Sequence, residues 1–253
     1  MMLTFIKKLG VFWGVGLVMF ALRLCQNAYC FDSATGLYLG GTAGVVLGVL
    51  TVAALLLSLL FSLRSGKDRP HFSDYFTVPQ RSTTVLVIAA FLLMTGGVAV
   101  GMGALSDPLR IAALVTAVLA LLSGVSLLVL TRQMRHGETY SFTTTIPLMF
   151  FGAFWVLTLY LPAASDPILA RFYLPVLAAA VSAYAFSQFA GFFRGETRVR
   201  TFRCVAAYAL TLSIASVAEL NAHSILFAAC ALLLSAFLAL EGRPAEPAAP
   251  ENE

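Results

Sequence analysis

Residues 39–63 read LGGTAGVVLGVLTVAALLLSLLFSL, a run of 25 positions without one charged side chain. A helix needs roughly 20 mainly apolar residues to cross the hydrocarbon core of a bilayer. This run meets that requirement, and other stretches of similar character occupy most of the chain. The sequence therefore predicts a protein whose helices are solvated largely by lipid.

The composition of the whole chain supports the same interpretation. Of its 253 residues, 60% are hydrophobic and 11% are charged, and the mean hydropathy is +0.90. Soluble domains are roughly 45–50% apolar and about 25% charged. The net charge of +4 does not indicate nucleic-acid binding, because the basic residues lie in short loops between apolar runs and form no basic face.

Eight apolar stretches predict an all-α polytopic bundle of eight spans, arranged as four tandem hairpins within residues 1–240. The expected spans are about 9–25, 39–63, 82–105, 109–130, 143–162, 168–192, 203–220 and 223–240. The seventh and eighth spans are the weakest pair, because only Asn221 and Ala222 separate them. Together they are too long for one crossing, so we expect a tight helical hairpin at Asn221.

The basic residues predict the orientation of the bundle. With the N-terminus inside, 13 of the 16 Lys and Arg residues lie on the cytoplasmic side, as the positive-inside rule requires. The three on the outer side are Arg23, Arg110 and Arg171. We therefore expect a multi-pass protein of the cell membrane, with both termini in the cytoplasm and the lipid bilayer as its partner. Residues 241–253 are acidic and rich in proline, which predicts a disordered cytoplasmic tail.

Two neighbouring hairpins carry similar motifs at the same spacing. The matched motifs are Ser106-Asp107-Pro108 with Ser165-Asp166-Pro167, and Gly137-Glu138-Thr139 with Gly195-Glu196-Thr197. Both hairpins start and end on the inner side, so a duplication would give a parallel repeat about an axis along the membrane normal. Convergent helix caps are the alternative, because Asp-Pro is a common way to begin a helix.

A group of polar residues falls at the outer ends of the first and seventh spans. Arg23 and Glu219 are expected at similar depth and are therefore able to pair. With Asp32, Asn221 and His223 they form a candidate ligand-binding site at a polar outer mouth. The alternative, which the sequence favours, is that both charges reach the lipid headgroups as ordinary snorkelling side chains.

Other chemistry has little support in the sequence. A disulfide between Cys25 and Cys30 is one interpretation if the outer side is oxidising, but two free cysteines at a helix end are favoured. The chain has no GxxxxGK[ST] or HExxH motif and no Cys/His cluster with zinc spacing. We therefore predict no catalytic residues, no metal site and no cofactor.

Short motifs distributed over most of the chain resemble those of one protein group. The motifs are Phe31-Asp32-Ser33-Ala34-Thr35-Gly36-Leu37, Trp155 with Tyr160, Ala164-Ser165-Asp166-Pro167-Ile168, Ala190-Gly191-Phe192, Arg200-Thr201-Phe202 and Ala218-Glu219. They resemble an uncharacterised group of multi-helix membrane proteins from gut Clostridia and relatives. The resemblance implies an eight-helix bacterial membrane protein and no particular activity.

Three functions remain open on the sequence. The first is a non-enzymatic membrane protein that binds or senses a small ligand at its outer mouth or through its inner loops. The second is a permease, or a permease subunit, built on the repeated hairpins. The third and least favoured is a membrane-embedded enzyme acting on lipid or isoprenoid, because clustered acids or histidines at one depth are missing.

Overall fold

The computed structural model describes residues 2–31, 38–63, 72, 80–104, 110–136, 141–165 and 169–240. Within these ranges the chain forms eight long helices and no strand, apart from one antiparallel bridge between Phe31 and Tyr38. The long helices are α1 (Met2–Tyr29), α2 (Thr42–Leu63), α4 (Gln80–Gly103), α5 (Arg110–His136), α6 (Ile146–Ser165), α7 (Leu169–Gly191), α8 (Val199–Ser216) and α9 (Ala222–Ala239). All eight contain a stretch long and apolar enough to cross a membrane, which confirms the predicted all-α bundle of eight spans.

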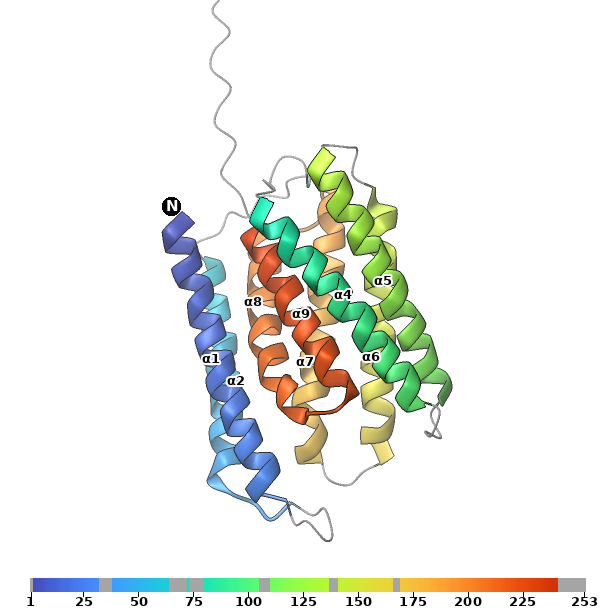
Figure 1. Ribbon diagram of the computed structural model, residues 1–253. Coiled ribbons are helices and arrows are strands. Elements are labelled where there is room, and N and C mark those ends of the chain that lie inside the picture. The colour runs from blue at the N-terminus through green and yellow to red at the C-terminus, as the bar shows by residue number, and fades with distance from the viewer. Residues whose placement is uncertain are drawn as a thin grey trace, which may run out of the picture.

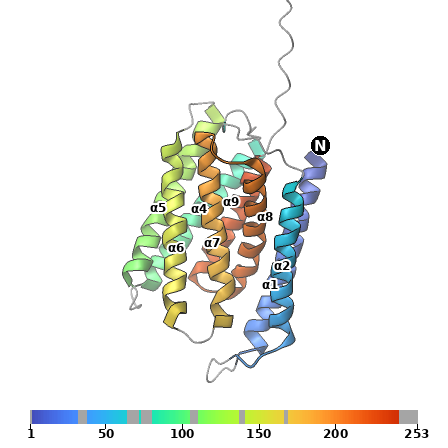
Figure 2. The same cartoon turned by 180° about the vertical axis from the view of Figure 1, so that it is seen from behind.

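The two helices of each hairpin pack against each other, and the last hairpin along the chain occupies the middle of the bundle (Figures 1 and 2). Helix α9 packs extensively on α4, and α8 contacts α1, α2 and α7 as well as α9. The α1–α2 hairpin lies at one edge of the bundle, beside α8, and α5 lies toward the opposite edge. Each of the first three hairpins therefore contacts the fourth, and the four are not laid in a row.

The burial pattern of each helix follows from this arrangement. Every residue of α8 from Ala206 to Ser216 is buried, because neighbouring helices surround it. In α2 the buried residues form a single stripe, and the rest of the helix surface is open to lipid. The stripe consists of Leu47, Thr51, Ala54, Ser58 and Ser62. Spacings of three and four residues place these side chains on one helix face.

Small residues allow helices α4 and α5 to approach closely. A Cβ added to Gly97 would lie 2.9 Å from the Ala120 Cβ, and one added to Gly124 would lie 2.9 Å from the Ala90 carbonyl oxygen. Small residues at such crossings let helix backbones pack at short range, which is how spanning helices associate in lipid. The glycines of this hairpin therefore serve packing.

Each of the two hairpins with similar motifs contains one contact between its own segments, at the end of the bundle that carries the N-terminus. Arg135 donates from Nε to the Thr83 hydroxyl at 3.3 Å, and the Arg194 guanidinium lies 3.9 Å from the centre of the Phe142 ring. Both members of the second contact lie 59 positions after those of the first (83 to 142, 135 to 194). The residues at Ser106–Pro108 and Gly137–Thr139 lie outside the described ranges, as do Asp166 and Pro167.

The turn between α8 and α9 lies where the sequence predicts it. Helix α8 continues into a short 3-10 helix, η4 (Val217–Glu219), and Leu220 then adopts a left-handed conformation with φ of 51°. Asn221 begins α9 with a capping box: its Oδ1 accepts from the His223 N–H at 2.9 Å, and its own N–H donates to the Ser224 hydroxyl at 3.0 Å. With 18 residues each, α8 and α9 are short, so this turn is set back from the ends of α1, α2, α6 and α7 (Figure 1).

Candidate ligand-binding site

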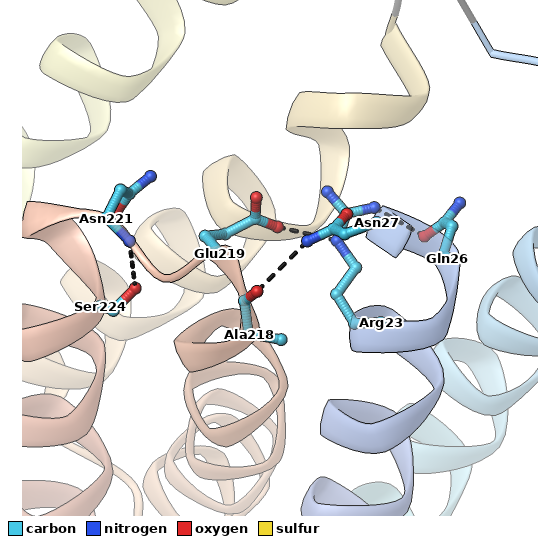
Figure 3. A network of polar contacts seen from close by, with 7 residues as sticks. All are labelled: Arg23, Gln26, Asn27, Ala218, Glu219, Asn221 and Ser224. Atoms are coloured by element: carbon cyan, nitrogen blue, oxygen red, sulfur yellow. Dashed lines mark hydrogen bonds and ion pairs between the residues drawn. The ribbon is translucent and has the colours of Figure 1, made fainter. Parts of the chain in front are cut away.

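An ion pair joins α1 to the end of the central hairpin, at the end of the bundle opposite the N-terminus (Figures 1 and 3). Arg23 donates from Nε to Glu219 Oε1 at 2.7 Å. The Arg23 side chain is 0% exposed and that of Glu219 is 12% exposed. The alternative in which both charges snorkel to the headgroups is therefore wrong for Arg23, which is enclosed by protein.

Further polar contacts hold Arg23 in place. Its Nη1 donates to Gln26 Oε1 at 2.6 Å, and its Cζ lies 6.0 Å from the centre of the Tyr173 ring. One residue further along α1, the Asn27 side-chain amide donates to the Ala218 carbonyl at 3.2 Å. A buried charge is costly unless it is paired and hydrogen-bonded. The contacts to Gln26 and Glu219 meet that requirement and fix the guanidinium on one side of the carboxylate.

On its other side, Glu219 lines a pocket of about 400 Å³ between α6, α7 and α9. This volume is within the range of small-molecule sites, which are mostly apolar with a few polar groups. The lining residues are Thr158, Leu159, Pro162, Phe172, Pro175, Glu219, Asn221, His223 and Phe227. Figure 3 shows the second carboxylate oxygen of Glu219 turned away from Arg23. That oxygen has no hydrogen-bond partner among the described residues.

His223 is held in the pocket wall by a buried tryptophan. The Trp155 indole donates from Nε1 to His223 Nδ1 at 3.3 Å. An indole N–H only donates, so Nδ1 is the acceptor in this contact. Trp155 is fully buried between Phe151 and Phe227, whose ring centres lie 5.4 and 4.6 Å away. Trp155 therefore orients the imidazole of His223 beside the pocket.

Two prolines alter the backbone of the pocket wall. Pro162 lies inside α6 and Pro175 inside α7, and both line the pocket. A proline has no N–H, so the carbonyl four residues earlier loses its helical donor. In α6 that carbonyl belongs to Thr158, which also lines the pocket. In α7 it belongs to Arg171, in the first turn of the helix. One of these two carbonyls, that of Thr158, therefore belongs to a residue of the pocket wall.

The structure brings together most of the residues that the sequence singled out. Arg23 and Glu219 pair directly, while Asn221 and His223 line the same pocket as Glu219. Asp32 lies outside the described residues. Cys25 is exposed and Cys30 is buried, and the two thiols are not bonded to each other in this structure.

Several lining residues were not expected from the sequence. Phe172 and Phe227 supply aromatic walls, and Trp155 orients His223. Apolar residues inside a span look alike in a sequence, so their position beside Glu219 depends on how α6, α7 and α9 pack. Pro162 and Pro175 were the available signals, because a proline inside a span marks an interrupted helix.

In the part of the chain that the structure describes, no three His, Cys, Asp or Glu residues come close enough together to hold a metal ion. Comparison with protein-family models, with curated proteins and with solved structures finds no match to this chain.

Proposed function

We propose that this multi-pass membrane protein binds a small solute in the pocket beside Glu219, at the extracytoplasmic end of the bundle. One observation carries the proposal: a carboxylate held by a fully buried arginine lines a pocket of about 400 Å³. We infer a bacterial cell membrane and cytoplasmic termini from the resemblance and from the distribution of the basic residues. The pocket then opens toward the outside of the cell.

The Arg23–Glu219 pair is a costly way to join helices if joining is its only purpose. Replacing a buried ion pair with packed apolar residues is often neutral or stabilising, so such a pair is weak support for a structural role alone. Ionisable groups within spans are functional candidates by default. Here Glu219, whose second carboxylate oxygen is turned away from Arg23, lines a pocket with three further polar residues, Thr158, Asn221 and His223.

The orientation has its own test. We expect a cysteine-reactive, membrane-impermeant reagent to label a cysteine placed at Asn221 in intact cells, and not one placed at Arg198 near the inner end. Both positions are exposed in the structure. The background variant lacks the native exposed Cys25. Labelling at Arg198 alone would overturn the assignment of the pocket to the outer side.

Ligand binding is tested with the purified protein in lipid nanodiscs. A panel of small solutes is screened for an increase in melting temperature, because a ligand that binds only the folded state stabilises it by about 2.7 kcal/mol at 100 times its Kd. We expect at least one solute to stabilise the wild type and to lose that effect in Glu219→Gln. The matched control is Glu196→Gln, an exposed glutamate at the other end of the bundle. Equal stabilisation of all three proteins by every active solute would contradict the proposal.

A permease is the second candidate, and one feature favours it. The Ser216 hydroxyl is buried without a hydrogen-bond partner among the described residues. Ser216 lies about one helical turn before Glu219 in the chain. One turn further, the hydroxyls of Ser213 and Ser182 lie 3.2 Å apart between α8 and α7. These groups extend polarity from the pocket toward the membrane interior. A permease would move a stabilising solute into sealed vesicles, and a binding protein would leave it outside.

A further inference from the structure

We infer that the ligand of this pocket is a small organic cation, with an ammonium group beside Glu219 and an apolar body against Phe172 and Phe227. The inference rests on the proposed function and specifies the chemistry of the same site.

The charges around the pocket favour a cation. Glu219 lines the pocket, whereas Arg23 lies behind it, is fully buried and does not contribute to the lining. The ion pair is therefore a dipole whose negative end faces the cavity, and a ligand meets the carboxylate before the guanidinium.

The uncharged parts of the wall also favour a cation. Pro162 and Pro175 free two helix carbonyls, those of Thr158 and Arg171, and the first belongs to a residue of the pocket wall. Carbonyl oxygens accept hydrogen bonds and attract positive charge. Phe172 and Phe227 add aromatic faces, whose negative quadrupole attracts ammonium groups. These acceptors and rings add to the attraction that the Glu219 carboxylate exerts on a cation.

The apolar part of the lining favours an apolar body beside the ammonium group of the ligand. The apolar residues that line the pocket are Leu159, Phe172, Phe227 and the two prolines. An inorganic cation would leave this surface uncovered, while an organic cation with a compact apolar body covers it. The pocket volume of about 400 Å³ admits a body the size of one substituted ring.

A series of three probes that share a benzene ring and carry a positive, a neutral or a negative polar group tests the inference. Benzylammonium, benzyl alcohol and benzoate share one ring and one methylene or carboxyl carbon, and their binding is measured by calorimetry on wild-type protein in neutral-lipid nanodiscs. Protein-free nanodiscs provide the background for partition into lipid. We expect benzylammonium to bind at least tenfold more tightly than either of the other two, because a hydrogen bond to a charged group is stronger than a neutral one.

Two variants connect the selectivity to the site. Glu219→Gln should weaken benzylammonium binding tenfold or more and leave benzyl alcohol unchanged. Glu219→Gln also leaves Arg23 buried opposite a neutral partner. A second variant, Phe172→Leu, therefore keeps the ion pair intact. We expect it to weaken benzylammonium binding about threefold, because the aromatic ring is lost. Glu196→Gln should match the wild type.

The outcomes separate the inference from the proposed function. Preference for benzoate or benzyl alcohol that depends on Glu219 would overturn the cation assignment and leave a solute site standing. Failure of all three probes to bind would overturn the inference, while a stabilising solute found in the wider panel would keep the proposed function. Benzylammonium binding that is equal in wild type and in both variants would also overturn the inference.

Discussion

The first and last hairpins of the chain differ in the solvent that surrounds them. In α8 and α9, 72% and 67% of the apolar stretch is buried within the protein, whereas the figures for α1 and α2 are 28% and 22%. Mean hydropathy runs the other way for α8 and α2, at 1.4 and 2.6. A helix surrounded by other helices needs shape and small residues, while a helix surrounded by lipid needs apolar surface. Helices α9 and α1 show the opposite order, at 2.1 and 1.6, so hydropathy alone does not identify the central helices of this protein.

The two hairpins are joined at a few polar points. Trp13 of α1 donates from Nε1 to the Ser235 hydroxyl of α9 at 3.0 Å, and Arg23 pairs with Glu219 at the other end of the helix. Asn27 adds the bond to the Ala218 carbonyl. The hydrophobic effect gives helices little reason to associate in lipid. Such polar contacts therefore contribute to holding the α1–α2 hairpin on the α8–α9 hairpin.

The largest expected effect is on the packing of α9, in the central α8–α9 hairpin, against α7. Phe237 of α9 is fully buried and stacks on Phe189 of α7 with ring centres 3.7 Å apart. Phe237→Ala leaves a cavity, and we expect it to lower the free energy of unfolding by about 4 kcal/mol. Phe91→Ala is the control, because Phe91 is 56% exposed on α4. Equal losses in the two variants, measured by denaturant unfolding in detergent, would show that the central hairpin is not the core.

The sequence predicted eight helices, their order and the α8–α9 turn, because span length and the cap at Asn221 are local properties. It ranked the last two spans as the weakest pair, because only Asn221 and Ala222 separate them. The structure gives the reason for the low hydropathy of α8: its neighbours replace lipid on all sides.

The second largest effect concerns the ion pair between the two hairpins. Glu219→Gln removes one partner and leaves the buried Arg23 charge uncompensated, so we expect a loss of about 3 kcal/mol in the free energy of unfolding. Arg23→Gln combined with Glu219→Gln removes both charges and should cost less than the sum of the single changes. The double-mutant cycle should give a coupling of at least ~1 kcal/mol. A coupling near zero would mean that the pair does not hold the hairpins together.

The site was predicted less completely than the fold. Arg23 and Glu219 were paired from their equal depth, which needs only span boundaries and orientation. The pocket itself required knowing that α6 and α7 pack beside the α8–α9 turn, and no periodicity in either span shows that contact. The burial of Arg23 was missed for the same reason: a residue near a span end is expected to reach the headgroups unless another helix covers it.

A smaller effect is expected at the hydrogen bond between Trp13 of α1 and Ser235 of α9. Trp13→Phe keeps the ring packing and removes the donor to Ser235, which retains its own bond to the Ala231 carbonyl at 2.7 Å. Hydrogen bonds between spanning helices contribute about 0.6 kcal/mol on average, and we expect a loss of that order. Ser235→Ala should cost more, because it leaves the Trp13 N–H without its acceptor. The opposite ranking in unfolding measurements would contradict this account of the contact.

The smallest effect is expected on the outer face of α2. Val49 is 62% exposed, and lipid contacts it in the folded protein and in the dissociated helix alike. Val49→Ala therefore changes no transfer free energy between the two states, and we expect a change within about 0.5 kcal/mol. The matched variant Ala54→Val adds volume to a position that is 1% exposed, in the stripe packed inside the bundle, and should destabilise the protein by about 1–3 kcal/mol. A Val49→Ala cost as large as that of Ala54→Val would require protein rather than lipid against this face, and a second copy of the chain would be the first partner to test by crosslinking.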